Sequence, residues 1–202
     1  MIGKIDYHTC RLDYPNFPRV DNRKEIFFFP QVCQFRILSV SCKPAKGHGE
    51  NLSRELDKLF QMIGLENLIF LGEYKRAWRH QENSYPTVQD ALAYLKQHKV
   101  TKNFDGALDI PKSEWPIFFK HLFWLVRCNA ALPTFHFMDS RQLLLGSLCQ
   151  YGNVHLNTLT TEAEEKFLKA IKETSFVELH GERCHSSFSN SNKIVGRQTL
   201  HS

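Results

Sequence analysis

Apolar residues recur along this chain at two spacings, and each spacing predicts a different kind of element. Between residues 50 and 63, apolar side chains stand at positions i, i+4, i+7, i+8 and i+11, which places them on one helix face. Gly64 follows directly, where a glycine commonly ends a helix. Runs rich in β-branched and aromatic residues favour strands instead. These runs occupy residues 25–30, 32–42, 68–71 (extendable to 78) and 103–110.

Three more apolar runs follow one another toward the C-terminal end. They occupy residues 134–138, 143–149 and 154–159. The breaks between them contain Asp139-Ser140 and Gly152-Asn153, which suit tight turns. Because strands joined by tight turns pair antiparallel, we predict a three-stranded antiparallel meander.

Polar residues mark the expected starts of further helices. Thr87 and Ser113 precede apolar helical patterns as N-caps, and Thr161 with Glu164 has the spacing of a capping box. The helix after Ser113, residues 114–128, is apolar on nearly every side, so it must be central or hidden in an interface. About four helices are expected in total.

The chain shows no sign of a division into several domains. No proline-rich or Gly/Ser-rich linker interrupts residues 25–178, so we predict a single α+β domain with a mixed or antiparallel sheet. Residues 1–24 alternate polar and aromatic types with two prolines, which indicates an irregular N-terminal arm. Residues 179–202 are rich in Ser, Asn and His, and we expect a mobile polar tail there.

Composition excludes several classes of protein. The 202 residues are 42% hydrophobic and 23% charged, values that exclude a disordered or low-complexity chain. The net charge is +5 with no polybasic block, so charge alone gives little support to nucleic-acid binding. The longest apolar run, residues 115–126, is interrupted by Lys120 and His121 and is shorter than the about 20 residues of a membrane span. No membrane association is therefore expected.

The six cysteines contain no C-x-x-C pair, which excludes a zinc ribbon and a thioredoxin-like motif. The first residues lack the apolar core of a secretory signal, so we expect a cytoplasmic protein with free thiols and no cofactor. His180, Cys184 and His185 are of metal-ligand types, but no second ligand pair accompanies them in the sequence. We therefore predict no metal site.

Glu73 and Lys75 have the spacing of a nuclease motif. In restriction-type nucleases, Glu-x-Lys on a strand places a metal-binding carboxylate and a catalytic lysine on the same face, because side chains two apart share a face. That arrangement also needs an acidic ligand on a neighbouring strand, and here a helix precedes instead. A solvated strand end accounts for the same two residues.

Basic and aromatic residues alternate just beyond this motif, at Lys75, Arg76, Trp78 and Arg79. Such a surface binds phosphates through the cations while an indole stacks on a base. On a strand, however, Lys75 and Arg79 would face away from Arg76 and Trp78. A half-buried tryptophan flanked by solubilising charges is the alternative interpretation.

His136 and His155 lie on the outer strands of the predicted meander. Paired histidines on strands perform acid–base chemistry on phosphodiesters. The two-histidine phosphoesterases carry Ser or Thr two residues after each histidine, whereas this chain has Met138 and Asn157 there. The sequence therefore does not match the two-histidine phosphoesterases. The alternative interpretation is that both are half-exposed histidines on strands without a catalytic role.

No phosphate-binding glycine loop, G-x-S-x-G elbow or H-E-x-x-H motif is present. We therefore expect a non-enzymatic protein that binds another macromolecule, as a protein partner or a second copy of itself. An accessory or immunity-type inhibitor fits this profile. Trp115, Phe119 and Phe123 on the apolar helix are the predicted interface anchors. The alternative is a nucleic-acid-binding protein or metal-dependent nuclease that uses residues 73–79.

Overall fold

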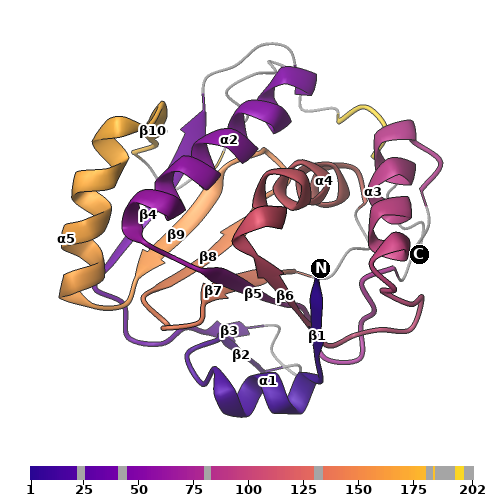
Figure 1. Cartoon of the computed structure of the whole chain (residues 1–202), viewed down its shortest axis with the longest axis horizontal. Helices are drawn as coiled ribbons and strands as arrows, with labels where there is room; N and C mark the ends of the chain where they lie inside the picture. Colours follow the sequence, from indigo (N-terminus) through magenta and orange to yellow (C-terminus); the bar gives the residue numbers. More distant parts are fainter. Residues whose placement is uncertain are drawn as a thin grey trace.

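An antiparallel sheet runs through the centre of the computed structural model, which describes residues 1–21, 26–40, 45–79, 83–129, 134–180, 184 and 194–197 (Figure 1). Within these ranges the sheet has eight strands in the order β1-β6-β5-β7-β8-β9-β4-β10. The strands are β1 (Gly3–Ile5), β4 (Gln34–Val40), β5 (Asn67–Leu71), β6 (Ala107–Pro111), β7 (His136–Asp139), β8 (Leu144–Leu148), β9 (Val154–Thr158) and β10 (Phe176–Glu178). A separate hairpin consists of β2 (Arg19–Asp21) and β3 (Ile26–Phe28).

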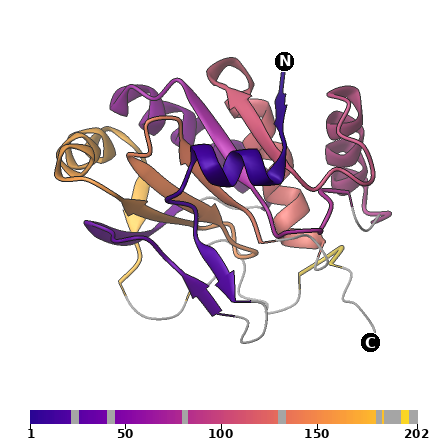
Figure 2. The same ribbon diagram turned by 90° about the horizontal axis from the view of Figure 1, so that it is seen from below.

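The helices divide between the two faces of the sheet (Figures 1 and 2). On one side α2 and α4 pack together over the strands, α5 flanks α2, and α3 flanks α4. On the other side lie α1 and the β2–β3 hairpin. The bounds are α1 (Tyr7–Asp13), α2 (Ala45–Ile63), α3 (Pro86–Gln97), α4 (Trp115–Cys128) and α5 (Thr161–Ala170), with 3-10 turns at Lys112–Glu114 and Ile171–Glu173.

Alternation along the strands distributes the hydrophobic residues between two clusters. Strand side chains that face α2 and α4 join a large core rich in phenylalanine. Its rings include Phe70, which lies 4.7 Å from Phe118 and 5.3 Å from Phe137, measured between ring centroids. Strand side chains of the opposite face join a smaller cluster with Cys10 and Phe17 from the α1 segment. Both faces of the central strands are therefore buried.

The predicted α+β class and the predicted meander are confirmed. β7, β8 and β9 pair antiparallel in sequence order. The amphipathic helix is also present, although α2 begins at Ala45, before the amphipathic pattern itself starts. Gly64 ends it as predicted, with a φ of 80° that suits glycine, and the N–H of Leu65 donates to Phe60 O at 3.0 Å.

Two of the predicted N-caps, Thr87 and Ser113, are wrong. α3 begins at Pro86, and α4 follows a 3-10 turn and carries Pro116 in its first turn. Proline fixes φ near the helical value and has no N–H to be satisfied. Neither helix has a side-chain hydrogen bond at its N-cap.

The start of α5 is displaced by one residue from the predicted capping box at Thr161. The cap is Thr160, whose side chain accepts a hydrogen bond from the N–H of Ala163. Glu164 forms an ion pair with Arg36, at 2.6 Å between Nη2 and Oε1, instead of returning to the cap. This pair ties α5 to β4.

The described part of the N-terminal segment, residues 1–21, contains regular elements, which corrects the irregular arm predicted for residues 1–24. β1 pairs with β6, so that Gly3 lies opposite Asp109 at the edge of the sheet. Asp6 caps α1 by accepting hydrogen bonds from the N–H groups of His8 and Thr9. The pairing of β1 depends on a strand about 100 residues away, and the cap depends on a polar side chain. The pattern of hydrophobic residues therefore predicted neither of them.

The tail predicted for residues 179–202 lies largely outside the described residues. The short described stretch at 194–197 packs on α4, where Arg197 Nη1 donates to Arg127 O at 2.7 Å. Across the described ranges, no helix has both the length and the apolar character needed to cross a membrane.

Gly146 provides a test of the core packing between β7 and β8. It lies opposite Phe137, and a Cβ added to Gly146 would overlap the Phe137 ring. We expect Gly146→Ala to lower the free energy of unfolding by about 1–3 kcal/mol, because the ring must shift within a packed core. Urea denaturation measures this difference.

The matched control is Ser147→Ala, because this neighbouring side chain points to the opposite face of the strand. It should change the free energy of unfolding by no more than about 0.5 kcal/mol. Equal unfolding midpoints for Gly146→Ala and the wild type would contradict the tight packing of Phe137 on this glycine.

Candidate functional site

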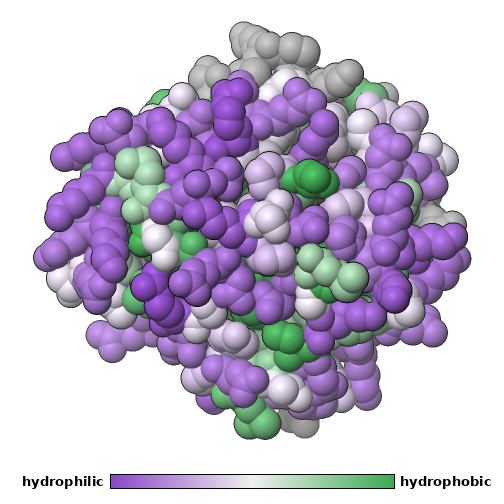
Figure 3. All heavy atoms as spheres, viewed as in Figure 1, coloured by the Kyte–Doolittle hydropathy of each residue, from purple (hydrophilic) through white to green (hydrophobic). Residues whose placement is uncertain are grey.

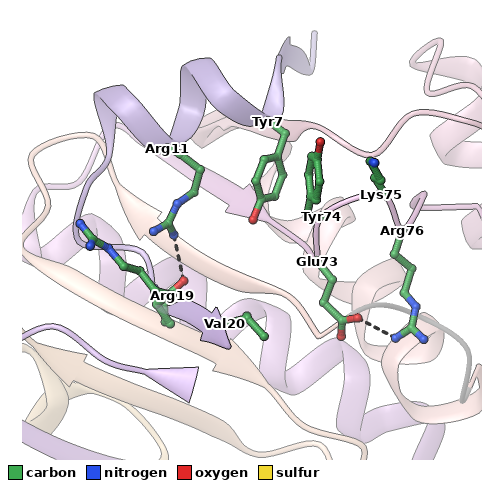
Figure 4. Close-up of a pocket in the computed structure, with 9 residues that line it drawn as sticks. Tyr7, Arg11, Arg19, Val20, Glu73, Tyr74, Lys75 and Arg76 are labelled. Atoms are coloured by element: carbon green, nitrogen blue, oxygen red, sulfur yellow. Dashed lines mark hydrogen bonds and ion pairs between the residues drawn. The ribbon is translucent and has the colours of Figure 1, made fainter. Parts of the chain in front are cut away.

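A hollow of about 480 Å³ opens where α1, β2 and the segment after β5 meet (Figure 4). We call it the basic pocket. Its described lining residues are Tyr7, Arg11, Pro18, Arg19, Val20, Glu73, Tyr74, Lys75 and Arg76. Four of these side chains are cationic and one is anionic, which leaves a net charge of 4 − 1 = +3. Such a surface attracts anions.

One wall of the basic pocket is a turn rather than a strand. β5 ends at Leu71, and the N–H of Arg76 donates to Glu73 O at 3.2 Å. Lys75 has a φ of 60°, a strained conformation for a residue other than glycine. The prediction that Glu73 and Lys75 share the face of a strand is therefore wrong, because the strand ends before both of them.

The opposite wall comes from α1 and the segment that follows it. Tyr7 and Arg11 are four residues apart on α1, so they project from the same side of the helix. Arg11 Nη1 donates to the carbonyl oxygens of Phe17 and Pro18, at 2.9 and 2.8 Å. These bonds hold the chain that leads into β2 and Arg19.

Aromatic rings lie beside the cations (Figure 4). The ring centroids of Tyr7 and Tyr74 are 5.0 Å apart, and His8 lies 5.3 Å from Tyr74. The Nζ of Lys75 is 5.1 Å from the centre of the Tyr74 ring. Tyr74 is 44% exposed, so its ring offers a flat surface to solvent.

Some charged side chains of the basic pocket form ion pairs within the protein, and others do not. Arg76 forms an ion pair with Glu73 at 2.7 Å, and the same carboxylate accepts the N–H of Thr134 at 2.9 Å. Neither Arg19 nor Lys75 forms an ion pair with another residue of the described ranges. These two exposed cations are the ones available to an anionic ligand.

Two of the residues predicted to bind nucleic acid do not line this pocket. Trp78 is buried, stacks on Phe135 at 3.8 Å between ring centroids, and donates from Nε1 to Gly106 O at 2.9 Å. The predicted stacking of Trp78 on a base is therefore wrong, because the segment turns inward after Arg76. Arg79 Nη1 instead lies 3.4 Å from Val100 O.

The predicted interface anchors on α4 lie inside the protein. Trp115, Phe119 and Phe123 are buried among the other aromatic rings of the core. The side of the molecule seen in Figure 3 is mainly hydrophilic, with only small hydrophobic patches. The apolar character of α4 therefore follows from its central position, and these three side chains present no surface to a partner.

His136 and His155 are brought together by the sheet. His136 lies opposite Ser147, and Ser147 lies opposite His155, so the three side chains form a row on one face. Both histidines line a cavity of about 370 Å³ whose apolar walls include Phe29, Val32 and Phe35. Burial, and then the charge of His155, lower the pKa of His136 to about 4. The sequence alone left this convergence open.

A third cluster contains residues that could hold a metal. The ligand atoms of Cys149, His155 and Cys184 all lie within 4.8 Å of one another. Sequence reasoning considered Cys184 only with its neighbours, and His185 lies outside the described residues. Cys184 is 35 positions from Cys149, so no local spacing could have revealed the pair.

The basic pocket likewise contains residues that sequence reasoning missed: Tyr7, Arg11, Arg19 and Tyr74. The i, i+4 spacing of Tyr7 and Arg11 could have indicated that they share one helix face, but the sequence analysis did not predict a helix there.

Comparison with known proteins found no matching family model, no matching curated protein and no matching solved structure. The chemistry of this chain's own residues therefore carries the functional proposals.

Because His136 is buried with a lowered pKa, its protonation favours the unfolded state. In the unfolded chain its pKa is about 6.5. Between pH 6.5 and 4 the unfolded state therefore binds a proton that the folded state does not, and stability falls as the pH falls. This residue should remove about 2 kcal/mol from the free energy of unfolding between pH 7 and 5.

Urea denaturation at several pH values measures this effect. His136→Asn should show a pH dependence weaker by that amount, whereas His8→Asn, at an exposed ring, should keep the wild-type dependence. Identical pH profiles for His136→Asn and the wild type would show that His136 does not titrate as its burial requires.

Proposed function

We propose that the protein binds single-stranded nucleic acid through the basic pocket. The observation that carries this proposal is the convergence of four cationic side chains and two tyrosine rings around one hollow. Lysine and arginine bind phosphates without regard to sequence. Aromatic rings stack on bases, which are accessible only in an unpaired strand.

The contacts of the pocket residues favour a division of roles. Arg19 and Lys75 are exposed and serve as phosphate contacts. Tyr74 presents its ring to a base, with the Tyr7 ring 5.0 Å away as support. Arg11 positions the segment before β2 through its bonds to backbone carbonyls.

The same contacts favour binding without cleavage. Metal-dependent nucleases hold their cations with several carboxylates. Glu73 is the only carboxylate among the described residues that line the basic pocket, and it is already bound by Arg76 and by the N–H of Thr134. The nuclease alternative therefore lacks its second acidic ligand here.

Charge reversal in the basic pocket tests this function. We expect Lys75→Glu and Arg19→Glu each to weaken binding of a labelled single-stranded oligonucleotide by at least about tenfold, because a phosphate contact becomes repulsive. The slope of log K against log salt should also decrease by about one for each change. Fluorescence anisotropy at about 50 and about 200 mM salt measures both quantities.

Lys169→Glu is the matched control, since it makes the same charge change at an exposed position on α5, across the sheet from α1. It should leave the affinity nearly unchanged. Tyr74→Ala should weaken binding by about 1–3 kcal/mol if the ring stacks on a base. Equal losses in Lys169→Glu and Lys75→Glu, or no binding at low salt, would contradict binding at this pocket.

A second candidate function is binding of a protein partner, as first expected from the sequence. It is favoured by an apolar surface formed just after β3 and at the start of β4, where Phe29 is 52% and Phe35 is 47% exposed and both line the cavity of about 370 Å³. Exposed aromatic clusters of this kind occur at protein interfaces. This surface replaces the α4 anchors as the candidate interface.

Cross-linked capture with two variants tests the second candidate. A partner, or a second copy of the chain, should be retained by the wild type and by Lys75→Glu but lost with the double variant Phe29→Ser and Phe35→Ser. Equal capture by the double variant and the wild type would remove this surface from consideration.

A further inference from the structure

Three metal-ligand side chains meet at the end of the β8–β9 hairpin. Cys149 directly follows β8, His155 lies on β9, and Cys184 comes from the C-terminal segment. The hairpin turn is held by the N–H of Cys149, which donates to Asn153 O at 3.0 Å. Gly152 has a φ of 80°, and a Cβ there would overlap His48, so the turn depends on glycine. The backbone thus places Cys149 and His155 side by side.

The distances within this cluster are close to those of a tetrahedral metal site. The Sγ atoms of Cys149 and Cys184 are 3.3 Å apart, and all three ligand atoms lie within 4.8 Å of one another. In zinc sites, Zn–S bonds of about 2.3 Å place two sulfurs about 3.8 Å apart. The two thiols therefore need to separate by only about 0.5 Å to accept a zinc ion.

The polar atoms around the cluster are compatible with a bound cation. The Nδ2 of Asn153 lies 2.8 Å from Cys184 Sγ. His155 Nε2 is buried and has no hydrogen-bond partner among the described residues. Two cysteine sulfurs and an imidazole within 4.8 Å of one another form a donor set for a soft or borderline metal.

We propose that Cys149, His155 and Cys184 bind one zinc ion. Two sulfurs and one imidazole nitrogen favour zinc over magnesium or calcium, which prefer oxygen ligands. Three protein ligands leave the fourth coordination position to water or a small ligand. Cys149 and His155 also line a cavity of about 310 Å³ beside Ser147, which gives that position access to solvent.

The site has a structural consequence that does not depend on nucleic-acid binding. Cys184 belongs to a segment far from the hairpin in sequence, so a shared metal would tie the C-terminal segment to the sheet. Binding to the folded state alone raises stability with metal concentration. Zinc should therefore raise the melting temperature of the full chain.

Cobalt substitution tests the proposal in the reduced, chelator-treated full chain. Co²⁺ should bind in a 1:1 ratio, with a thiolate-to-metal charge-transfer band and the visible bands of tetrahedral coordination, and Zn²⁺ should abolish both. Cys184→Ser, Cys149→Ser and His155→Gln should each weaken Co²⁺ binding by more than about tenfold. Cys33→Ser, at an exposed cysteine outside the cluster, should bind as the wild type does.

Three results would overturn the proposal. The first is the absence of a charge-transfer band in the folded, reduced wild type. The second is a band of undiminished strength in Cys184→Ser, which serves as the test if Cys149→Ser fails to fold. The third is a Cys149–Cys184 disulfide found by mass spectrometry after air exposure, together with no metal binding after reduction, which would assign a redox pair instead.

Discussion

Phenylalanine rings packed between the sheet and α4 hold the rest of the structure in place. Phe70 on β5 contacts Phe118 on α4 and Phe137 on β7, with ring centroids 4.7 and 5.3 Å apart. Rings of this size fill a core only when the strands and the helix keep one relative position. The helices α2, α3, α4 and α5 consequently gather on one side, and little of that side is left for chemistry.

The opposite face of the sheet is covered only in part, by α1 and the β2–β3 hairpin (Figure 2). The polar groups of interest border this face because the phenylalanine core occupies the other. The basic pocket lies beside α1 and the end of β5, and the row from His136 to His155 crosses the neighbouring strands β7, β8 and β9. Cys149 follows the same alternation as Ser147, which places it next to His155.

The electrostatics of the basic pocket explain why binding is the function proposed there. A carboxylate already occupied by Arg76 and Thr134 has little capacity left for a metal, whereas Arg19 and Lys75 lack ion-pair partners among the described residues. The cysteine cluster instead favours a cation, because thiols and an imidazole are metal ligands. The two sites therefore call for ligands of opposite charge and can be tested separately.

The sequence by itself determined the α+β class, the amphipathic α2 with its glycine end, and the β7–β8–β9 meander, because these depend on periodicity and turns within a few residues. It also directed attention to Lys75, Arg76 and Cys184. Only the tertiary structure decided that Trp78 is buried, that Arg19 and Lys75 line the same pocket, and that the sulfurs of Cys149 and Cys184 lie close together. The physical reason is that burial and convergence arise from packing between segments distant in sequence, and local spacing carries no record of that packing.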